Sequence, residues 1–331
     1  MSSRYVISKM TYRSKSILFW CLIIFTMHKK KKAKIPDRLY PGDTVGVIAP
    51  AGPFNRERFK KGIKALESMG FAVFVPKGVF KRDGYHAGSG GHRAKMVNDL
   101  FVNPTIKAIV CARGGFGAMK ILSMLDYAVI QQHPKAFVGF SDISALLSTL
   151  YTLTGLVTFH GPMVTTLSDS TQKTKKAMIS ALSSEKPLEI ASEKGVTIRS
   201  GCSSGPVSGG NLTTLCHLVG TPFEPDYTGH ILFLEDQGEA VYRIDRMLTQ
   251  MRLAGCFDGL GGLLLGSFDN CGKDDEIFRV VESVFQGEDI PMLAGFEIGH
   301  GKDNMTVPIG IDATLNTDRK MLLYHGCATQ G

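Results

Sequence analysis

The chain has little of what builds metal centres or disulfide frameworks. Its seven cysteines in 331 residues are scattered without any C-x-x-C pair, and its nine histidines show no H-x-x-x-H spacing. An odd number of unclustered cysteines argues against a disulfide framework and fits a reducing compartment. The histidine spacing gives no indication of zinc. We therefore expect no metal and no cofactor.

Acidic residues are absent from the first 36 positions, which hold nine Lys and Arg residues. The whole chain has a formal charge of +8, but the remainder carries 29 basic against 30 acidic residues. The basic balance therefore belongs to the tail and is no evidence that the folded part binds nucleic acid. The tail also holds the only tryptophan, Trp20.

Long hydrophobic runs are missing as well. The apolar stretch at residues 17–27 is too short to span a bilayer as a helix, and the lysines at 29–32 oppose export. Three interpretations of residues 1–36 are open: an uncleaved signal-like anchor, a disordered tail, or an over-extended start with Met27 as the true initiator. We favour the latter two, and expect a cytoplasmic protein without stable membrane insertion.

Strands and helices alternate through residues 37–167. Buried-type strands are predicted at 44–49, 71–75 and 106–111, and helical periodicity runs over 56–69 and 92–101. A further helix is predicted to begin at Ala118. This alternation indicates a parallel sheet with helices on both faces. In such sheets the active site lies at the carboxyl ends of the strands.

A second domain is predicted from residue 205 to residue 331. Residues 168–204 are polar and irregular, and we interpret them as a linker. The second domain begins with a glycine-rich loop at 205–211. Strands follow at 231–234 and 261–266, a helix starts at Tyr242, and the segment 291–301 contains His300.

Ser141 follows an apolar run that stops abruptly at Gly139-Phe140, and helical periodicity restarts after it. This placement lifts the side chain out of the sheet toward free N–H groups at the start of a helix, where a serine can act as a nucleophile. The alternative is an ordinary N-cap serine. The second glycine of the G-x-S-x-G elbow is missing, so the segment alone leaves both interpretations open.

A serine nucleophile needs a base, and the base needs an orienting acceptor. His300 lies between two glycines after an apolar segment, and His160 is the rival base; either could equally be a structural polar residue. Glu235 follows four apolar residues and is a candidate strand-end acid, with Asp236 and Glu239 as alternatives in the same loop. The other interpretation of Glu235 is a solvated loop acid or a partner for Arg243 or Arg246.

The segment Gly-Gly-Phe-Gly at 114–117 precedes the helix expected from Ala118. It could cradle a phosphate, although it matches neither G-x-G-x-x-G nor a P-loop. The same backbone could equally donate an N–H group to a tetrahedral oxyanion.

Six short motifs occur in an order that resembles the LD-carboxypeptidase (muramoyltetrapeptide carboxypeptidase) family of serine peptidases, which is related to the microcin C self-immunity peptidases. The resemblance spans roughly residue 36 to the C-terminus. Each motif is weak alone, but the six in order are specific. They are GDTVGVIAPAGP (42–53), ARGGFG (112–117), GFSD (139–142), LED (234–236), YRIDR (242–246) and GHG (299–301).

The resemblance implies an α/β fold: an N-terminal flavodoxin-like parallel-sheet domain and a β-rich α/β C-terminal domain. It implies a triad of Ser141 as nucleophile, Glu235 as orienting acid and His300 as base. The oxyanion donors would be the backbone N–H groups of Asp142 and Gly115. The family is typically dimeric and uses no metal, so a homodimer is expected.

The implied reaction releases terminal D-alanine from murein tetrapeptides in cytoplasmic cell-wall recycling. By position, Arg113 is a candidate for binding the substrate carboxylate; a structural salt bridge is the alternative.

Two other functions stay open. The microcin C branch hydrolyses aminoacyl-nucleotide analogues on an aromatic platform, notably a Trp. Because the only Trp lies in the tail and the interval from Ser141 to Glu235 is compact, the murein branch is favoured. The third function is a non-catalytic peptide- or phosphate-binding α/β protein. Whether the third peptide residue is lysine or diaminopimelate stays open.

Overall fold

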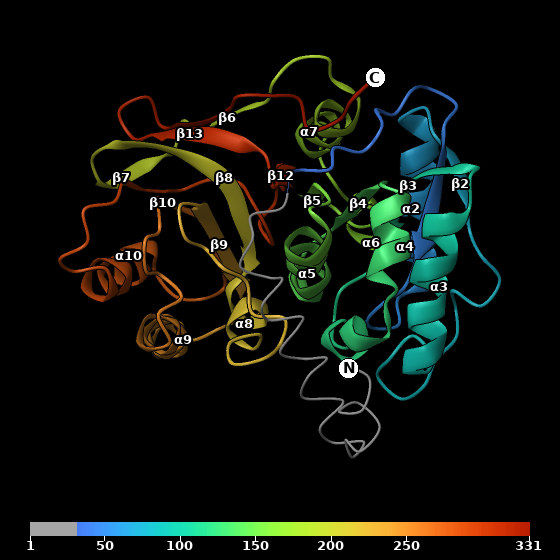
Figure 1. Ribbon diagram of the computed structural model, residues 1–331, viewed down its shortest axis with the longest axis horizontal. Coiled ribbons are helices and arrows are strands. Elements are labelled where there is room, and N and C mark those ends of the chain that lie inside the picture. Colours follow the sequence, from blue (N-terminus) through green and yellow to red (C-terminus); the bar gives the residue numbers. More distant parts are fainter. Residues whose placement is uncertain (1–31) are drawn as a thin grey trace, which may run out of the picture.

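The computed structural model describes residues 32–331, which form two sheets side by side (Figure 1). The N-terminal sheet has the strand order β2-β1-β3-β4-β5-β12. Its strands are β1 (Thr44–Ile48), β2 (Ala72–Phe74), β3 (Ile106–Cys111), β4 (Ala136–Gly139), β5 (Thr158–His160) and β12 (Val307–Ile309).

The first five of these strands are parallel, and β12 pairs with β5 in the antiparallel direction. The order 2-1-3-4-5 is the flavodoxin-like one, as expected from the resemblance. β12 comes from the C-terminal part of the chain, so the two halves share this sheet. Strand order reverses between β1 and β3, and the loops after β1, β3 and β4 all leave at the same edge.

Helices accompany the N-terminal sheet at positions that its sequence patterning dictates. Asn55 begins α2 by accepting hydrogen bonds from two N–H groups of the first turn, and Phe59 and Leu66 form its buried face. The helices of this part are α2 (Arg56–Ser68), α3 (Gly90–Val102), α4 (Tyr127–Gln132), α5 (Ser144–Thr154), α6 (Val164–Leu167) and α7 (Gln172–Ser183).

The helix predicted from Ala118 is not an α-helix. The segment Met119–Met124 is a short 3₁₀ helix, η2, which ends where Leu125 becomes extended. Its two fully buried side chains, Ile121 and Leu122, are adjacent in sequence. The tighter turn suits a connection too short to build a longer amphipathic face.

The C-terminal sheet has eight strands in the order β6-β14-β13-β8-β9-β10-β11-β7. The central strands β8 to β11 are parallel, and every other pairing in the sheet is antiparallel: β7 with β11, β13 with β8, β14 with β13 and β6 with β14. The strands are β6 (Glu189–Ala191), β7 (Val196–Arg199), β8 (Cys202–Asn211), β9 (Ile231–Gln237), β10 (Gly262–Asp269), β11 (Met292–Ala294), β13 (Asp312–Asn316) and β14 (Met321–Tyr324).

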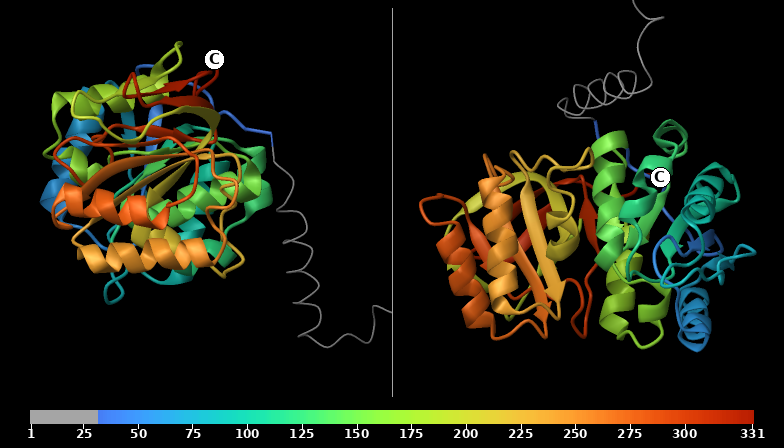
Figure 2. Two further views of the ribbon diagram at one scale, coloured as in Figure 1. Left: turned by 90° about the vertical axis from the view of Figure 1, so that its left-hand side faces the viewer. Right: turned by 90° about the horizontal axis from the view of Figure 1, so that it is seen from below.

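Three helices belong to this part of the chain: α8 (Leu212–Cys216), α9 (Val241–Leu253) and α10 (Asp274–Val284). Figure 2 shows α9 and α10 side by side on one face of the sheet. The fold is therefore an α/β protein with a mostly parallel N-terminal sheet and a mixed C-terminal sheet.

Two predicted irregular segments are ordered. The polar stretch 168–204 contains α7 and the strands β6 and β7, which occupy the two edges of the C-terminal sheet. Residues 205–211, predicted as a loop, are the second half of β8. A Cβ atom at Gly209 would overlap the Phe233 carbonyl oxygen on β9, and one at Gly210 would lie 2.5 Å from Ser144 Oγ. The glycines therefore allow close packing within a strand.

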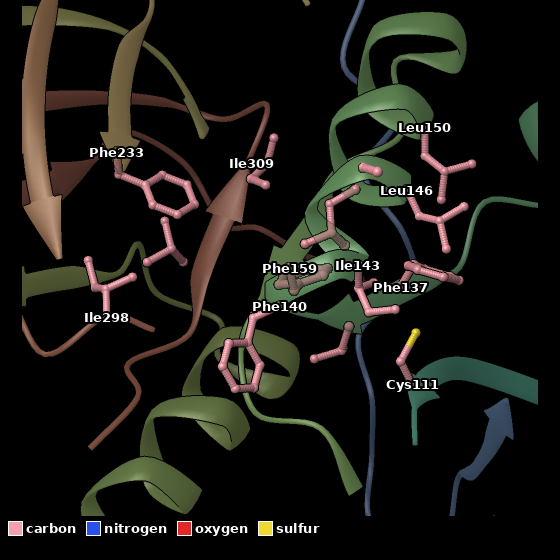
Figure 3. Close-up of a cluster of buried hydrophobic side chains, with 14 of the residues drawn as sticks. Cys111, Phe137, Phe140, Ile143, Leu146, Leu150, Phe159, Phe233, Ile298 and Ile309 are labelled. Atoms are coloured by element: carbon pink, nitrogen blue, oxygen red, sulfur yellow. The ribbon is translucent and has the colours of Figure 1, made fainter. Parts of the chain in front are cut away.

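An apolar core continues across the two halves of the molecule (Figure 3). Phe233 and Ile298 come from the C-terminal half, and Phe140, Ile143 and Phe159 from the N-terminal half; all are buried. Each such side chain contributes about 2 kcal/mol through burial. The halves are thus held together by the same kind of packing that stabilises each one.

Within residues 32–331 no helix is long and apolar enough to cross a membrane. The hydrophobic run at 17–27, Trp20 and the alternative start at Met27 lie outside the described residues.

Candidate active site

A cavity of about 560 Å³ opens between the two halves, and both contribute to its wall. Strand ends and the loops after them supply its polar lining, as expected for the carboxyl edge of parallel strands. The lining includes Gly115, Ser141, Asp142, Asn211, Asp236 and His300.

Ser141 follows β4 after one intervening residue and has a φ of 63°, in the left-handed region. Only Asn270 and Lys320 share a positive φ among the described non-glycine residues. Ser141 begins a 3₁₀ turn, η3 (Ser141–Ile143), whose capping residue is Phe140, and no side chain caps that turn. The N-cap interpretation is therefore wrong. Such a strained backbone costs about 1–3 kcal/mol and persists where the surroundings impose it.

The loop after β3 lies directly against this serine. A Cβ atom on Gly114 would lie 3.0 Å from Ser141 Oγ and 3.4 Å from the backbone nitrogen of Asp142. The next residue, Gly115, has a φ of +99° and lines the cavity. Glycine at both positions allows the backbone to approach the serine closely.

Asp142 connects the serine turn to that loop. Its Oδ2 accepts a hydrogen bond of 2.8 Å from the backbone N–H of Ala118. Burial raises the pKa of Asp142 to about 6, and the Ala118 N–H and Arg93 counteract only part of this effect. The carboxyl group therefore fixes the position of the two segments relative to each other.

Arg93 in α3 binds the loops that surround the serine turn, and sequence reasoning missed this residue. Its side chain is buried and donates hydrogen bonds to the carbonyl oxygens of Gly88 (3.1 Å), Pro50 (2.6 Å) and Gly117 (2.7 Å). A signal was available in the helical spacing, because Arg93 shares the apolar face with Val97, four residues later.

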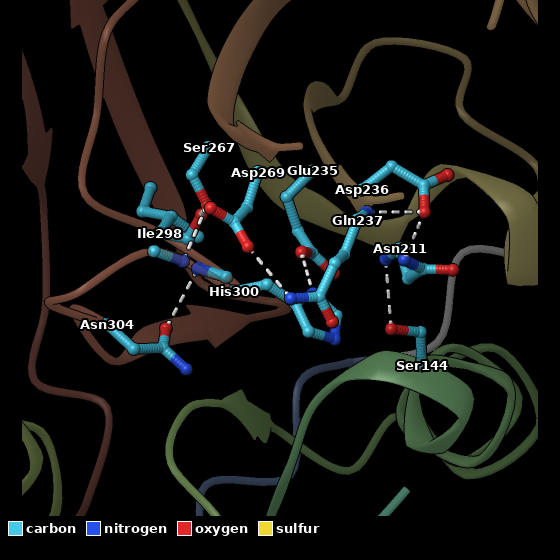
Figure 4. Close-up of polar contacts among 12 residues, drawn as sticks. Ser144, Asn211, Glu235, Asp236, Gln237, Ser267, Asp269, Ile298, His300 and Asn304 are labelled. Carbon is cyan, nitrogen blue, oxygen red and sulfur yellow. Dashed lines mark hydrogen bonds and ion pairs between the residues drawn. The ribbon is translucent and has the colours of Figure 1, made fainter. Parts of the chain in front are cut away.

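Glu235 and His300 form the other half of the site (Figure 4). Glu235 lies within β9 and is 0% exposed, so it is not the solvated loop acid considered above. Its Oε2 lies 2.6 Å from His300 Nδ1. A Cβ atom on Gly299, whose φ is +104°, would overlap that same Oε2. A glycine before the histidine is therefore required for this close approach.

The pair is electrostatically coupled. Burial by itself would raise the pKa of Glu235, but the two neighbouring histidines, His160 and His300, outweigh it and hold the pKa at about 2. Burial alone would lower the pKa of His300, but Glu235 raises it above its ordinary value. An imidazole bound through Nδ1 to a carboxylate has Nε2 left to accept a proton.

The alternative acids have different surroundings. Asp236 accepts hydrogen bonds from Asn211 Nδ2 (2.9 Å) and from the N–H and hydroxyl groups of Thr213 (2.9 and 2.7 Å). Asn211, which sequence reasoning also missed, lies in register with Glu235 at the end of β8. Glu239 lines the cavity, with its Oε2 3.4 Å from Arg243 Nη1.

Two other candidates are not brought to the cavity. His160 is 0% exposed, with its Nε2 3.7 Å from Glu235 Oε1, and it does not line the cavity. Arg113 donates a 2.7 Å hydrogen bond to the Pro53 carbonyl oxygen and does not line the cavity either. Among the described residues Arg113 forms no salt bridge, so that alternative is also not observed.

In the part of the chain that the structure describes, no three His, Cys, Asp or Glu side chains gather to hold a metal ion. What the site does contain is a strained serine, a histidine paired with a buried carboxylate, and a glycine loop packed against the serine. This combination can carry out acyl transfer.

Comparisons with known proteins agree with this chemistry. The LD-carboxypeptidase N-terminal domain model matches residues 45–161, and the C-terminal domain model matches residues 204–315. A probable murein peptide carboxypeptidase of Bacillus subtilis is 36% identical over 317 residues, covering 93% of this chain and 98% of that protein.

Two solved structures show the same architecture. An MccF-like protein from Bacillus anthracis superposes with a TM-score of 0.85 at 27% identity, over 89% of this chain and 100% of that one. A muramoyltetrapeptide carboxypeptidase from Oxalobacter formigenes gives a TM-score of 0.76 at 30% identity, over 85% and 97%. The motifs, the two matched domains and these likenesses together show that the chain belongs to the LD-carboxypeptidase family, related to the MccF microcin C immunity proteins.

Proposed function

We propose that this protein is a serine carboxypeptidase that cleaves an L,D amide bond and releases terminal D-alanine from murein tetrapeptides. The observation that carries the proposal is that strained Ser141 and the Glu235-paired His300 open into one cavity. The murein peptide carboxypeptidase among its relatives supports the choice of substrate.

In the proposed reaction Ser141 Oγ attacks the carbonyl carbon that precedes D-alanine. His300 Nε2 takes the serine proton as the new C–O bond forms, and then donates it to the amine as the C–N bond breaks. A water molecule, deprotonated by the same nitrogen, hydrolyses the acyl-enzyme. Glu235 holds the ring through Nδ1 and stabilises the imidazolium that exists between these steps.

The backbone N–H groups of Asp142 and Gly115 are the proposed oxyanion donors. Both residues line the cavity beside Ser141, and the loop that carries Gly115 is tied to the serine turn through Asp142 and Ala118. Preorganised donors of this kind contribute about 3–4 kcal/mol each to transition-state stabilisation.

Glu239 supports a substrate with a positive charge near the scissile bond. It lines the cavity, whereas the neighbouring Asp236 is already occupied by hydrogen bonds within the protein. A diamino acid at the third peptide position carries an amine that the Glu239 carboxylate can pair with, beside or in place of its 3.4 Å contact with Arg243.

The test is D-alanine release from L-Ala-γ-D-Glu-mDAP-D-Ala by the full chain and by Ser141→Ala. We expect release by the parent and loss of at least about 10³-fold in the variant. Ser204→Ala, an exposed serine in β8, is the matched control and should keep the parent rate. A folded parent that releases no D-alanine would refute the proposed substrate.

The second candidate is hydrolysis of aminoacyl-nucleotide analogues. The fold similarity to an MccF-like protein favours it, and so does an exposed aromatic pair at the cavity. Phe116, which lines the cavity, lies 6.1 Å from Tyr85 between ring centroids, and both rings are exposed. Bases stack on such rings. Cleavage of an aminoacyl sulfamoyl adenosine without D-alanine release would select this candidate.

A further inference from the structure

Glu235 is contacted by histidines from both halves of the molecule. His300, in the loop after β11, lies 2.6 Å from Oε2. His160, at the end of β5 in the N-terminal sheet, lies with its Nε2 3.7 Å from Oε1. Both Glu235 and His160 are 0% exposed. The second histidine has no part in the reaction proposed above, because it does not reach the cavity.

The facing atoms of His160 and Glu235 have no other partner. Neither ring nitrogen of His160 makes a hydrogen bond to any described residue. The same is true of Glu235 Oε1. Leaving a polar atom unpaired in a dry interior is destabilising. An imidazole N–H directed at a carboxylate oxygen would offset that cost for both groups at once.

Aromatic packing fixes the plane of the His160 ring. Phe140 and Phe233 pack against it edge-on, with ring centroids 5.8 and 5.0 Å away. These two rings come from opposite halves of the molecule. The ring therefore has little freedom to turn away from Glu235.

His160 is also tied to the strand that presents the serine. In the parallel pairing of β4 with β5, His160 lies in register with Gly139, two residues before Ser141. A contact between His160 and Glu235 therefore connects the acid on the C-terminal sheet to the strand that precedes the serine on the N-terminal sheet.

We propose that His160 is a positioning residue: it directs Nε2–H at Glu235 Oε1 and so keeps Oε2 turned toward His300 Nδ1. The inference rests on the proposed roles of Ser141, His300 and Glu235, although not on the identity of the substrate. Without His160 the carboxylate can rotate, and His300 loses the acceptor that orients its ring.

Three substitutions separate the N–H group from the bulk of the ring. His160→Gln carries a side-chain amide N–H at roughly the reach of Nε2. His160→Asn carries one at the reach of Nδ1, and His160→Phe keeps a ring without a donor. Thr158→Val is the matched control, because Thr158 is 0% exposed in the same strand and its hydroxyl donates to the Leu147 carbonyl oxygen, away from Glu235.

Two measurements are independent of the murein substrate. One is the rate at which a fluorophosphonate labels Ser141. The other is the downfield proton resonance of His300 Nδ1–H, which reports the bond to Glu235. In His160→Phe and His160→Asn we expect labelling about 10–100-fold slower and the resonance shifted or lost. His160→Gln should restore both, and Thr158→Val should change neither.

Parent-rate labelling with an unchanged resonance in folded His160→Phe would overturn the inference. Equal losses in Thr158→Val would do the same, since they would show a general packing effect. If His160→Phe does not fold, His160→Gln and His160→Asn test the inference by themselves. Equal labelling rates for these two variants would contradict a directed N–H group. Failure of the parent to cleave murein peptides would instead affect only the proposed function.

Discussion

The two halves of the proposed site are held in different ways. On the N-terminal side Ser141 is placed by the backbone and by side chains bonded to it: a positive φ, glycines in the facing loop, and hydrogen bonds between main-chain groups and the side chains of Asp142 and Arg93. On the C-terminal side the His300 ring is oriented by one side-chain hydrogen bond, to buried Glu235, and packs against the Phe140 ring at 4.7 Å between centroids.

This difference indicates where each half is vulnerable. Ser141 keeps its geometry until a substitution destabilises the loops around it. A base fixed by one carboxylate loses its orientation with a single atom changed. Contacts between the halves, such as the 3.0 Å hydrogen bond from the Asn211 N–H to Ser144 Oγ, keep the two in one geometry.

The largest effect should come from Glu235→Gln, which breaks the side-chain half alone. We expect kcat to fall by about 10⁴-fold, because the amide cannot stabilise the imidazolium. Glu235 raises the pKa of His300, so the variant should also move the acidic limb of kcat/KM to lower pH. The pH–rate profile is the measurement, and Glu185→Gln at an exposed ion pair is the control. An acidic limb that stays in place would contradict the account.

A smaller loss is expected from Gly299→Ala, which disturbs the same half through its backbone. The new Cβ would overlap Glu235 Oε2 and is strained at a φ of +104°. Displacement of the carboxylate should cost about 10²-fold in kcat/KM. Gly326→Ala, where a Cβ meets nothing within 4 Å, is the matched control. Equal kcat/KM values for the two variants would contradict the role assigned to the Glu235–His300 contact.

On the backbone half, Arg93→Met should act mainly on stability. It removes the guanidinium that donates to three buried carbonyl oxygens, of which that of Gly117 keeps a hydrogen bond from the Lys120 N–H, and we expect the free energy of unfolding to fall by about 3 kcal/mol. Urea denaturation measures this, with the exposed Arg279→Met expected to change it by less than about 0.5 kcal/mol. A variant as stable as the parent would show that the loops do not depend on this guanidinium.

The smallest effect concerns the pH dependence of stability at Asp142. Its folded pKa of about 6 lies above the value of about 3.9 in unfolded chains, so protonation favours the folded state. The contribution of Asp142 is therefore present below pH 4 and is lost as pH rises through 6. Relative to Asp142→Asn, the parent should lose on the order of 2 kcal/mol between pH 4 and pH 7. A difference that is constant over this range would contradict the raised pKa.

The sequence predicted the parallel N-terminal sheet from its strand periodicity, and the motif resemblance named Ser141 and His300, which both line the cavity, but it missed Asn211. It did not predict that 205–211 would be a strand, since glycines there serve contacts with β9 and α5. It also placed Arg113 at the site by proximity in sequence, whereas its side chain binds Pro53.

Long-range pairing explains the other differences. β6 and β7 are polar edge strands, whose pattern is indistinguishable from that of a loop until their partners are known. His160 could be named as a candidate base from its type and loop, but its contact with Glu235 depends on how the two sheets face each other.

The central claim is that Ser141 of one half and His300 of the other act as one unit. A double-mutant cycle tests it most directly, with D-alanine release measured for Ser141→Ala, His300→Ala and the double variant. The account expects the double variant to be about as slow as either single variant, because each change alone disables the unit. Losses that multiply would show that the two residues act independently, and would contradict the account.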